Sequence, residues 1–287
     1  MKKTVTVLLS VVLMVACALS VSACAKRSGS KEDAGTQGLN YTLNSDGQSY
    51  SVTGIGVALS KDIVIPSEYN SKPVTGIAKA AFKYGKITSV KLPDTLESIG
   101  EEAFASCESL KSVNFPTTLT SIGEKAFIYC SSLKSVTLPS SITRIENNTF
   151  QSCTGLESIT IPSSVTFIGA YVFYNCRSLK SIEIPSSVSI LGPFAFTMCT
   201  GLSSVEIPSS ITVIETQTFN GCTNLVSITL PDALESIGTS AFGFCSSLTD
   251  INYGGTKEQW NDVEKMYGWN SDTGSYTVHC KGEDVSK

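Results

Sequence analysis

The chain has 287 residues, of which 41% are hydrophobic and only 16% are charged, with 21 Lys and Arg against 25 Asp and Glu. This composition is too apolar for a disordered chain, and a net charge of −4 does not suit a nucleic-acid-binding protein. The charged fraction lies below the roughly 25% usual for soluble domains, so Ser and Thr must supply much of the wetted surface. The single histidine, His279, removes the residue on which most acid–base and metal chemistry relies. We therefore expect no enzymatic activity and no cofactor.

Residues 1–23 have the features of a secretory signal peptide. Lys2 and Lys3 precede an apolar run, residues 5–16, which is too short to cross a membrane. The segment ends in V-S-A-C, residues 21–24, which resembles the bacterial lipobox, whose cysteine is lipidated and becomes the first mature residue. We expect export with a lipid on Cys24, although A-C-A at 23–25 also fits ordinary signal cleavage.

Residues 24–40 predict a flexible tether, because they are rich in Lys, Ser, Gly, Asp and Thr and show no apolar periodicity. Removal of residues 1–23 leaves 19 cationic against 25 acidic side chains, a net charge of −6. We therefore expect no nucleic-acid partner. Residues 41–64 follow as an N-terminal cap, in which Tyr-x-Leu and Tyr-x-Val flank an Asp46-Gly47 turn, the pattern of a β-hairpin.

A repeat with a step of 23 residues organises residues 65–252. An earlier unit, Ile65–Lys91, departs from the pattern, with an insertion around residues 68–72 and no cysteine. A fixed period of this size predicts a solenoid, in which each coil buries its apolar face against its neighbours. Three residue types mark the step: Pro93, Pro116, Pro139, Pro162, Pro185, Pro208 and Pro231; Phe104, Phe127, Phe150, Phe173, Phe196, Phe219 and Phe242; and Cys107, Cys130, Cys153, Cys176, Cys199, Cys222 and Cys245.

The unit A-F-x-x-C-x-x-L-x-S-[VI]-x-[LI]-P resembles the BspA-like leucine-rich repeat of bacterial surface proteins, over seven regular units from Leu92 to Asn252. Leu133, Val136 and Leu138 carry the strand pattern of such a repeat. The resemblance implies binding to host matrix proteins or to other cells, without catalysis.

The predicted fold is a mainly β repeat solenoid of the leucine-rich-repeat type, a parallel stack of short strands in 23-residue coils. Each proline ends a strand because it lacks the N–H that a ladder needs. Ile142 and Ile145 predict a second short strand in the same coil. Residues 253–287 form the C-terminal cap, a short helix opened by T-K-E-Q at 256–259 and followed by a strand, Tyr276–Cys280. This segment resembles the family's usual C-terminal cap.

Ten cysteines in an exported protein would normally indicate disulfides. Stacked residues in a parallel array hold their Cβ atoms about 4.8 Å apart, however, beyond the roughly 3.5–4.5 Å of a disulfide. A spacing of 23 residues also gives no local zinc chelate. We therefore expect buried free thiols, with disulfides and a metal site as the alternatives. His279 and Cys280 would point to opposite faces of their strand, and we expect His279 to be an exposed polar residue.

The outward strand positions form rows of Ser and Thr, in which two carboxylates on adjacent coils stand out beside a lysine. This surface is the predicted binding site, and it comprises Lys180, Glu183, Glu206, Ser181, Ser204 and Thr160. Solubility alone would also explain the hydroxyl rows. An alternative patch comprises Tyr171, Tyr174, Phe194 and Met198, which core packing would explain as well.

Together these features indicate a lipid-anchored protein at the bacterial cell surface, joined to the membrane through its N-terminal lipid. Its expected partner is a protein or glycan on host matrix or on neighbouring cells. The alternative is a structural or envelope-assembly lipoprotein that binds other bacterial surface proteins.

Overall fold

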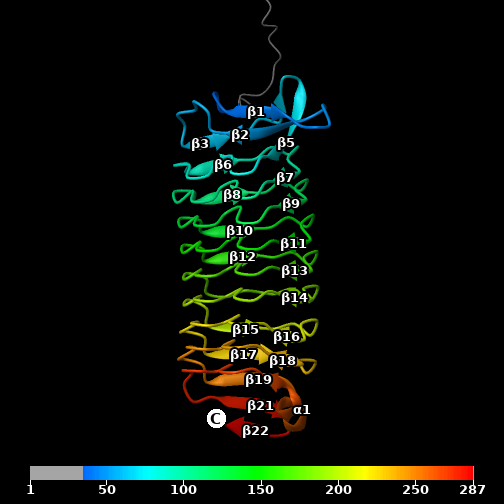
Figure 1. The fold of residues 1–287 in the computed structure, drawn as a ribbon, viewed down its shortest axis with the longest axis vertical. Helices are drawn as coiled ribbons and strands as arrows, with labels where there is room; N and C mark the ends of the chain where they lie inside the picture. Colours follow the sequence, from blue (N-terminus) through cyan, green and yellow to red (C-terminus); the bar gives the residue numbers. More distant parts are fainter. Residues whose placement is uncertain (1–34, 287) are drawn as a thin grey trace, which may run out of the picture. The chain divides into compact units, whose positions relative to one another are not determined.

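The computed structural model describes residues 35–286 as a stack of short coils (Figure 1). The signal peptide, Cys24 and most of the predicted tether lie outside the described residues.

One side of the stack is a ladder of parallel strands, here called the first ladder. Each strand pairs with the equivalent strand of the next coil, so that Val136 lies opposite Ile159. The middle residue of these strands is buried, as the repeat pattern predicts. The first ladder comprises β3 (Asp62–Val64), β6 (Ser89–Lys91), β8 (Ser112–Asn114), β10 (Ser135–Thr137), β12 (Ser158–Thr160), β15 (Ser204–Glu206), β17 (Ser227–Leu230), β19 (Asp250–Thr256) and β21 (Thr277–Lys281).

A second ladder of shorter strands forms another side of the stack. It confirms the second apolar pair of each coil as a strand, because Ile145 pairs with Ile168 of the next coil. The predicted mainly β solenoid is thus confirmed. The second ladder comprises β2 (Tyr50–Gly54), β5 (Lys72–Ile77), β7 (Ser98–Ile99), β9 (Ser121–Ile122), β11 (Arg144–Ile145), β13 (Phe167–Ile168), β14 (Ile190–Leu191), β16 (Val213–Ile214), β18 (Ser236–Ile237) and β20 (Glu264–Lys265).

The phenylalanines of successive coils form a continuous stack inside the solenoid. Phe82 and Phe104 lie nearly parallel with ring centroids 5.1 Å apart, and the stack continues to Phe242. The main chain on this side also joins the coils, since the Phe104 N–H donates to Ala126 O at 2.8 Å. Two residues in most of these segments have positive φ, such as Glu102 and Ser106. The bonds between coils hold these strained conformations in place.

A glycine after the second-ladder strand allows adjacent coils to approach closely. Gly169 N donates to Ile145 O at 2.9 Å, and a Cβ at Gly169 would lie 2.9 Å from the backbone N of Asn147. Glu146 and Glu215 replace this glycine in two of the regular coils, and Ala78 and Met266 take its place near the two ends of the stack. The second ladder is interrupted before each of the two glutamates, between β9 and β11 and between β14 and β16. The ladder therefore consists of three separate sheets.

Antiparallel strands lie at both ends of the described chain. β1 (Asn40–Leu43) pairs with β2, and β22 (Asp284–Ser286) pairs with β21. The insertion around residues 68–72 is a small hairpin of β4 (Glu68–Tyr69) against β5, with Tyr69 stacked on Tyr41 at 4.0 Å. Near the C-terminus, α1 (Lys257–Asp262) begins with a capping box between Thr256 and Gln259. Because β2 and β3 pair within the two ladders, residues 50–64, expected to be part of the cap, also form a coil.

Candidate functional site

The first and third residues of the first-ladder strands face solvent and form a surface that we call the strand face. In β10 and β12 these residues are Ser135, Thr137, Ser158 and Thr160, all of them exposed. Parallel pairing places equivalent hydroxyls in rows along the stack. The strand face can therefore hydrogen-bond a polar partner over several coils without rearranging its backbone.

Residues 181–183 have the sequence of a first-ladder strand but do not pair as one. The first ladder is divided at this point into two sheets, one ending at β12 and the other beginning at β15. Phe150 belongs to the coil of β12, and Phe173 belongs to the coil of residues 181–183. Their ring centroids are 6.1 Å apart, compared with 5.1 Å for Phe82 and Phe104. The rings of the coils that carry Glu183 and Glu206, Phe173 and Phe196, are 5.3 Å apart, so the wider separation lies on the N-terminal side of Glu183.

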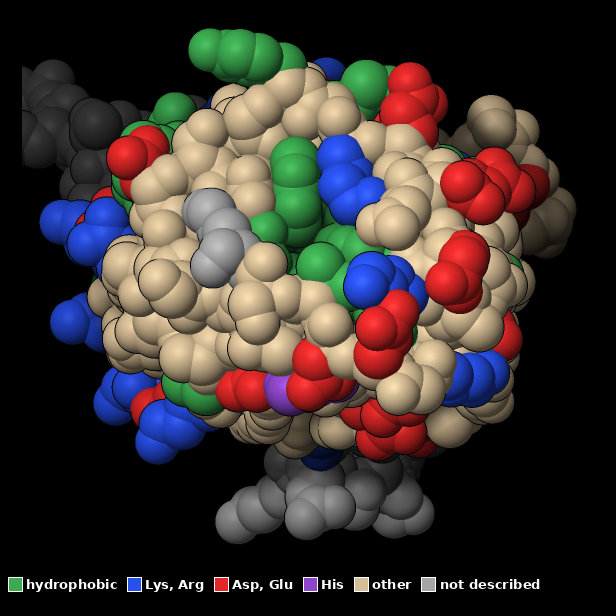
Figure 2. Space-filling model, turned by 90° about the horizontal axis from the view of Figure 1, so that it is seen from below, with side chains coloured by type: hydrophobic (Ala, Val, Ile, Leu, Met, Phe, Trp, Pro, Cys, Tyr) green, Lys and Arg blue, Asp and Glu red, His purple; other side chains and the backbone are tan. Residues whose placement is uncertain are grey.

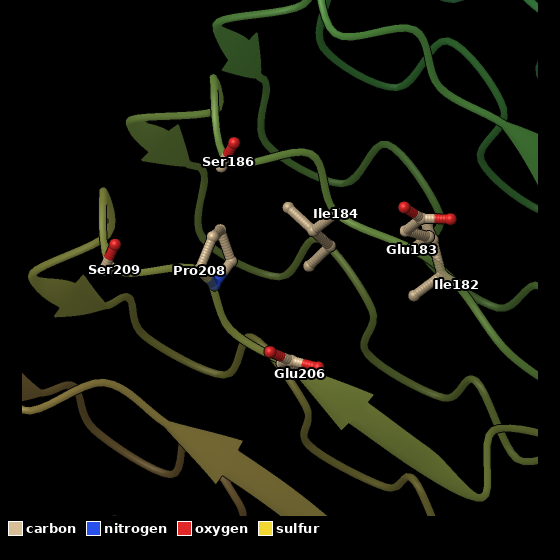
Figure 3. A pocket seen from close by; sticks show the side chains of 7 residues that line it. All are labelled: Ile182, Glu183, Ile184, Ser186, Glu206, Pro208 and Ser209. Atoms are coloured by element: carbon tan, nitrogen blue, oxygen red, sulfur yellow. The ribbon is translucent and has the colours of Figure 1, made fainter. Parts of the chain in front are cut away.

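Glu183 and Glu206 lie on the same hollow of about 400 Å³, here called the glutamate hollow (Figure 3). The two side chains come from neighbouring coils and are both exposed. Neither forms an ion pair within residues 35–286. Two carboxylates on one hollow make it negatively charged, so it would attract a cationic group of a ligand. The lining residues are Ile182, Glu183, Ile184, Ser186, Glu206, Pro208 and Ser209.

Lys180 does not line the glutamate hollow. It lies on a second hollow of about 530 Å³, here called the basic hollow, with Glu157, Arg177, Ser178, Gly201, Ser203 and Asn224. The pKa of Glu157 is lowered mainly by the hydrogen bond from Lys134 Nζ at 2.9 Å, and further by the charge of Lys180. The structure therefore brings Glu183 and Glu206 together and places Lys180 beside Glu157. The other predicted site residues, Ser181, Ser204 and Thr160, are exposed and line neither hollow.

The alternative aromatic patch is largely packed against itself. Tyr171 stacks on Phe194 with ring centroids 4.5 Å apart and an angle of 5° between the rings, and Tyr174 lies 5.8 Å from Tyr171. Met198 is 41% exposed and covers Gly221, where a Cβ would lie 2.9 Å from its sulfur. Tyr171, Phe194 and Met198 all have positive φ. The sequence gives no sign of this backbone conformation, since glycine is its usual residue.

The cysteine ladder consists of buried free thiols. Cys176 Sγ lies 3.2 Å from Phe150 O, and each of the other ladder cysteines makes the same contact with a phenylalanine carbonyl. Burial raises the pKa of Cys153 and Cys199 to about 12, so these thiols stay protonated and unreactive near neutral pH. All eight cysteines of the described residues are free.

His279, expected to be an exposed polar residue, is partly exposed and lies between two carboxylates. Its Nε2 lies 2.8 Å from Asp250 Oδ1 and its Nδ1 lies 3.2 Å from Asp284 Oδ1, so it bridges β19 and β22. Hydrogen bonding to Asp250, the largest contribution, raises the pKa of His279. Only the imidazolium can donate from both ring nitrogens. Asp250 and Asp284 surround the histidine only after the terminal hairpin forms, so sequence spacing did not predict the contact.

No group of three or more His, Cys, Asp or Glu side chains within residues 35–286 is arranged to hold a metal ion. The short helix α1 is far from the length needed to cross a bilayer, and no other described helix reaches that length either.

The pattern that defines the BspA type leucine rich repeat region matches residues 75–199 and 147–263, in six copies, and so covers more than half of the chain. The chain belongs to this family. The match falls on the same repeats whose prolines, phenylalanines and cysteines recur every 23 residues. No curated protein sequence matches the chain.

The chain is similar to solved structures of leucine-rich-repeat proteins, and one of them shows the shared fold. A leucine-rich repeat protein of T. pallidum is 28% identical, covers 78% of this chain and 91% of its own, and superposes with a TM-score of 0.52. A leucine-rich repeat protein of Bacteroides ovatus is 26% identical over 85% of this chain and 78% of its own, with a TM-score of 0.49. A leucine-rich cell surface protein of Faecalibacterium prausnitzii is 22% identical over 79% and 96%, with a TM-score of 0.45.

Proposed function

We propose that this BspA-type repeat protein is a lipid-anchored binding protein of the bacterial cell surface. Its solenoid would contact a protein or glycan on host matrix or on neighbouring cells. The observation that carries the proposal is the strand face, where the hydroxyl rows meet the unpaired Glu183 and Glu206 in a hollow. Family membership and the signal-peptide and lipobox pattern of residues 1–24 support display outside the cell.

The geometry favours binding over catalysis. The glutamate hollow is wide and open, and its only ionisable side chains are the two carboxylates. Rigid strands present the surrounding hydroxyls without conformational ordering, which lowers the entropic cost of binding. The ligand would place a basic group beside Glu183 and Glu206 and hydrogen-bond Ser and Thr of the neighbouring coils.

A binding assay with charge-reversed protein tests the proposal. The variant Glu183→Lys/Glu206→Lys is compared with Glu97→Lys/Glu235→Lys, which makes the same charge change at exposed carboxylates without ion pairs, outside the hollow. Each delipidated protein is passed over a solubilised host matrix preparation and over a bacterial envelope fraction. We expect the first variant to lose at least tenfold in retention on host matrix, while the control stays within about twofold of wild type.

Equal retention of both variants would place the ligand elsewhere on the surface. Retention of wild type by the bacterial envelope fraction alone would instead support the envelope-assembly alternative. Free energies of unfolding, measured in urea, that differ by no more than about 0.5 kcal/mol among the three proteins show that the comparison reports binding rather than folding.

A further inference from the structure

Cationic side chains gather in the turns that lead into the first six strand positions of the first ladder. These turns are residues 58–61, 85–88, 108–111, 131–134, 154–157 and 177–180. They contain two carboxylates, Glu108 and Glu157, against six cations, and we call this surface the basic edge. Its cations are Lys61, Lys86, Lys111, Lys134, Arg177 and Lys180.

The basic edge contrasts with the overall acidity of the chain. In the view along the stack from its C-terminal end, Lys and Arg side chains gather on one side of the outline (Figure 2). The equivalent turns of the later coils, residues 200–203, 223–226 and 246–249, carry no charged side chain. The positive charge of this row of turns is therefore confined to the first six coils.

Most of these cations are not neutralised by the protein. Within the described residues, the only ion pair of the basic edge joins Lys134 Nζ to Glu157 Oε1 at 2.9 Å. The remaining five cations are exposed. Residues in register on neighbouring coils lie about 4.8 Å apart. The row in register comprises Lys61, Thr88, Lys111, Lys134, Glu157 and Lys180, so four cations follow one line along the stack, and Lys86 lies two residues before Thr88.

The basic hollow lies at the C-terminal limit of this edge. Arg177 donates from Nε to Asn175 Oδ1 at 2.7 Å, which orients the guanidinium, and Arg177 forms no ion pair with the described residues. Ser178, Ser203 and Asn224 line the same hollow and offer hydroxyl and amide groups. The cations of the basic edge thus lie next to the basic hollow, which can hydrogen-bond the hydroxyl groups of a ligand.

We propose that the basic edge and the basic hollow bind an anionic polysaccharide that carries sulfate or carboxylate groups. A linear polyanion gains from release of counterions as it contacts the successive cations. The hollow accepts the sugar hydroxyls. The hydroxyl and amide groups of the hollow match the hydroxyls of a sugar, which favours a polysaccharide over nucleic acid. This site goes beyond the strand face and does not depend on Glu183 or Glu206.

The test measures binding of the delipidated mature protein to four immobilised polymers over a range of salt concentrations. Heparin carries sulfate groups, polygalacturonate carries carboxylates, dextran is uncharged and duplex DNA is a phosphate polyanion. We expect binding to heparin or polygalacturonate that weakens steeply with salt, and no binding to dextran. A preference between the first two identifies the anionic group of the ligand.

Charge reversal at the edge provides the matched comparison. Lys86→Glu/Lys111→Glu is expected to lose at least tenfold in affinity, whereas Lys125→Glu/Lys281→Glu, the same charge change away from the edge, stays within about twofold of wild type. The proposal is overturned if both variants lose equally, if DNA binds as tightly as the polysaccharides, or if neither anionic polysaccharide binds. Glu183→Lys/Glu206→Lys should still bind the polysaccharide, so failure of the strand-face proposal is distinguishable.

Discussion

The backbone N–H of Gly123 donates a hydrogen bond of 2.8 Å to the carbonyl of Ile99 in the preceding coil. A Cβ on Gly123 would lie 2.6 Å from the backbone N of Glu101, so no other residue allows this approach without displacement. The coils that carry Glu146 and Glu215 at the equivalent position are those at which the second ladder is interrupted. Glycine therefore permits this close approach between the regular coils, whereas Ala78 and Met266 make the same hydrogen bond near the two ends of the stack.

We expect Gly123→Ala to destabilise the protein by about 1–3 kcal/mol, because the added methyl group forces two backbones apart. Urea unfolding followed by circular dichroism measures the change. Glu146→Ala is the matched control, since its position already lacks the close approach, and it should stay within about 0.5 kcal/mol of wild type. Equal effects of the two substitutions would contradict the role assigned to the glycine.

The cysteine ladder should be chemically inert in the folded protein. Because burial raises the pKa of thiols such as Cys153 to about 12, iodoacetamide at pH 8 should modify half-buried Cys280 long before any ladder cysteine. Peptide mass spectrometry after timed labelling identifies the modified residues. Addition of urea should expose all of the ladder, and early modification of Cys176 in native buffer would show that the coils open.

Reducing agent should leave the melting temperature nearly unchanged, because the described cysteines are free. Cys176→Ser should cost about 1–3 kcal/mol, since a more polar group takes the buried position beside Phe150 O. A calorimetric scan with and without reductant distinguishes the two effects. A large fall in melting temperature on reduction would show that disulfides join the coils.

The clamp of His279 between Asp250 and Asp284 predicts a pH-dependent C-terminal hairpin. The pKa of His279 is raised above its ordinary value of 6.5, so its stabilising contribution is fully present below about pH 6.5 and is lost as pH rises through the raised pKa. Amide hydrogen exchange of β22 should therefore quicken, beyond the intrinsic base-catalysed rate, as the histidine deprotonates. His279→Gln should abolish this additional pH dependence, and a wild-type profile in that variant would assign it to another group.

Lipidation at Cys24 is the prediction that places the protein at a membrane. Mass spectrometry of the native N-terminus should find an acylated Cys24 as the first residue. Cys24→Ala should move the protein from the membrane fraction to the soluble fraction, because two or more acyl chains are needed for stable attachment. A mature N-terminus at another residue, without lipid, would contradict the assignment.

Much of the solenoid follows from the sequence alone. The 23-residue step of residues such as Pro139, Phe150 and Cys153 specifies the coil, its buried positions and its parallel strands, because a repeat can bury these side chains only against copies of itself. The spacing of Cβ atoms in a parallel array also favoured free thiols over disulfides within the ladder. The hydroxyl rows of the strand face also follow directly, since alternate strand residues must point outward.

Only the tertiary structure decided where the strand ladders are interrupted and which charged side chains contact one another. Glu183 and Glu206 are 23 residues apart and were expected to be neighbours, but the loss of strand pairing at residues 181–183, beside the hollow that they share, does not follow from the repeat pattern. Lys180 is only three residues from Glu183, yet it lies on a different hollow beside Glu157 of the preceding coil. His279 is clamped by Asp284 only because β22 folds back on β21. The repeated residues determine the fold of each coil. The contacts of Glu183, Lys180 and His279 depend on residues that break the repeat, and these residues meet only when the coils are stacked.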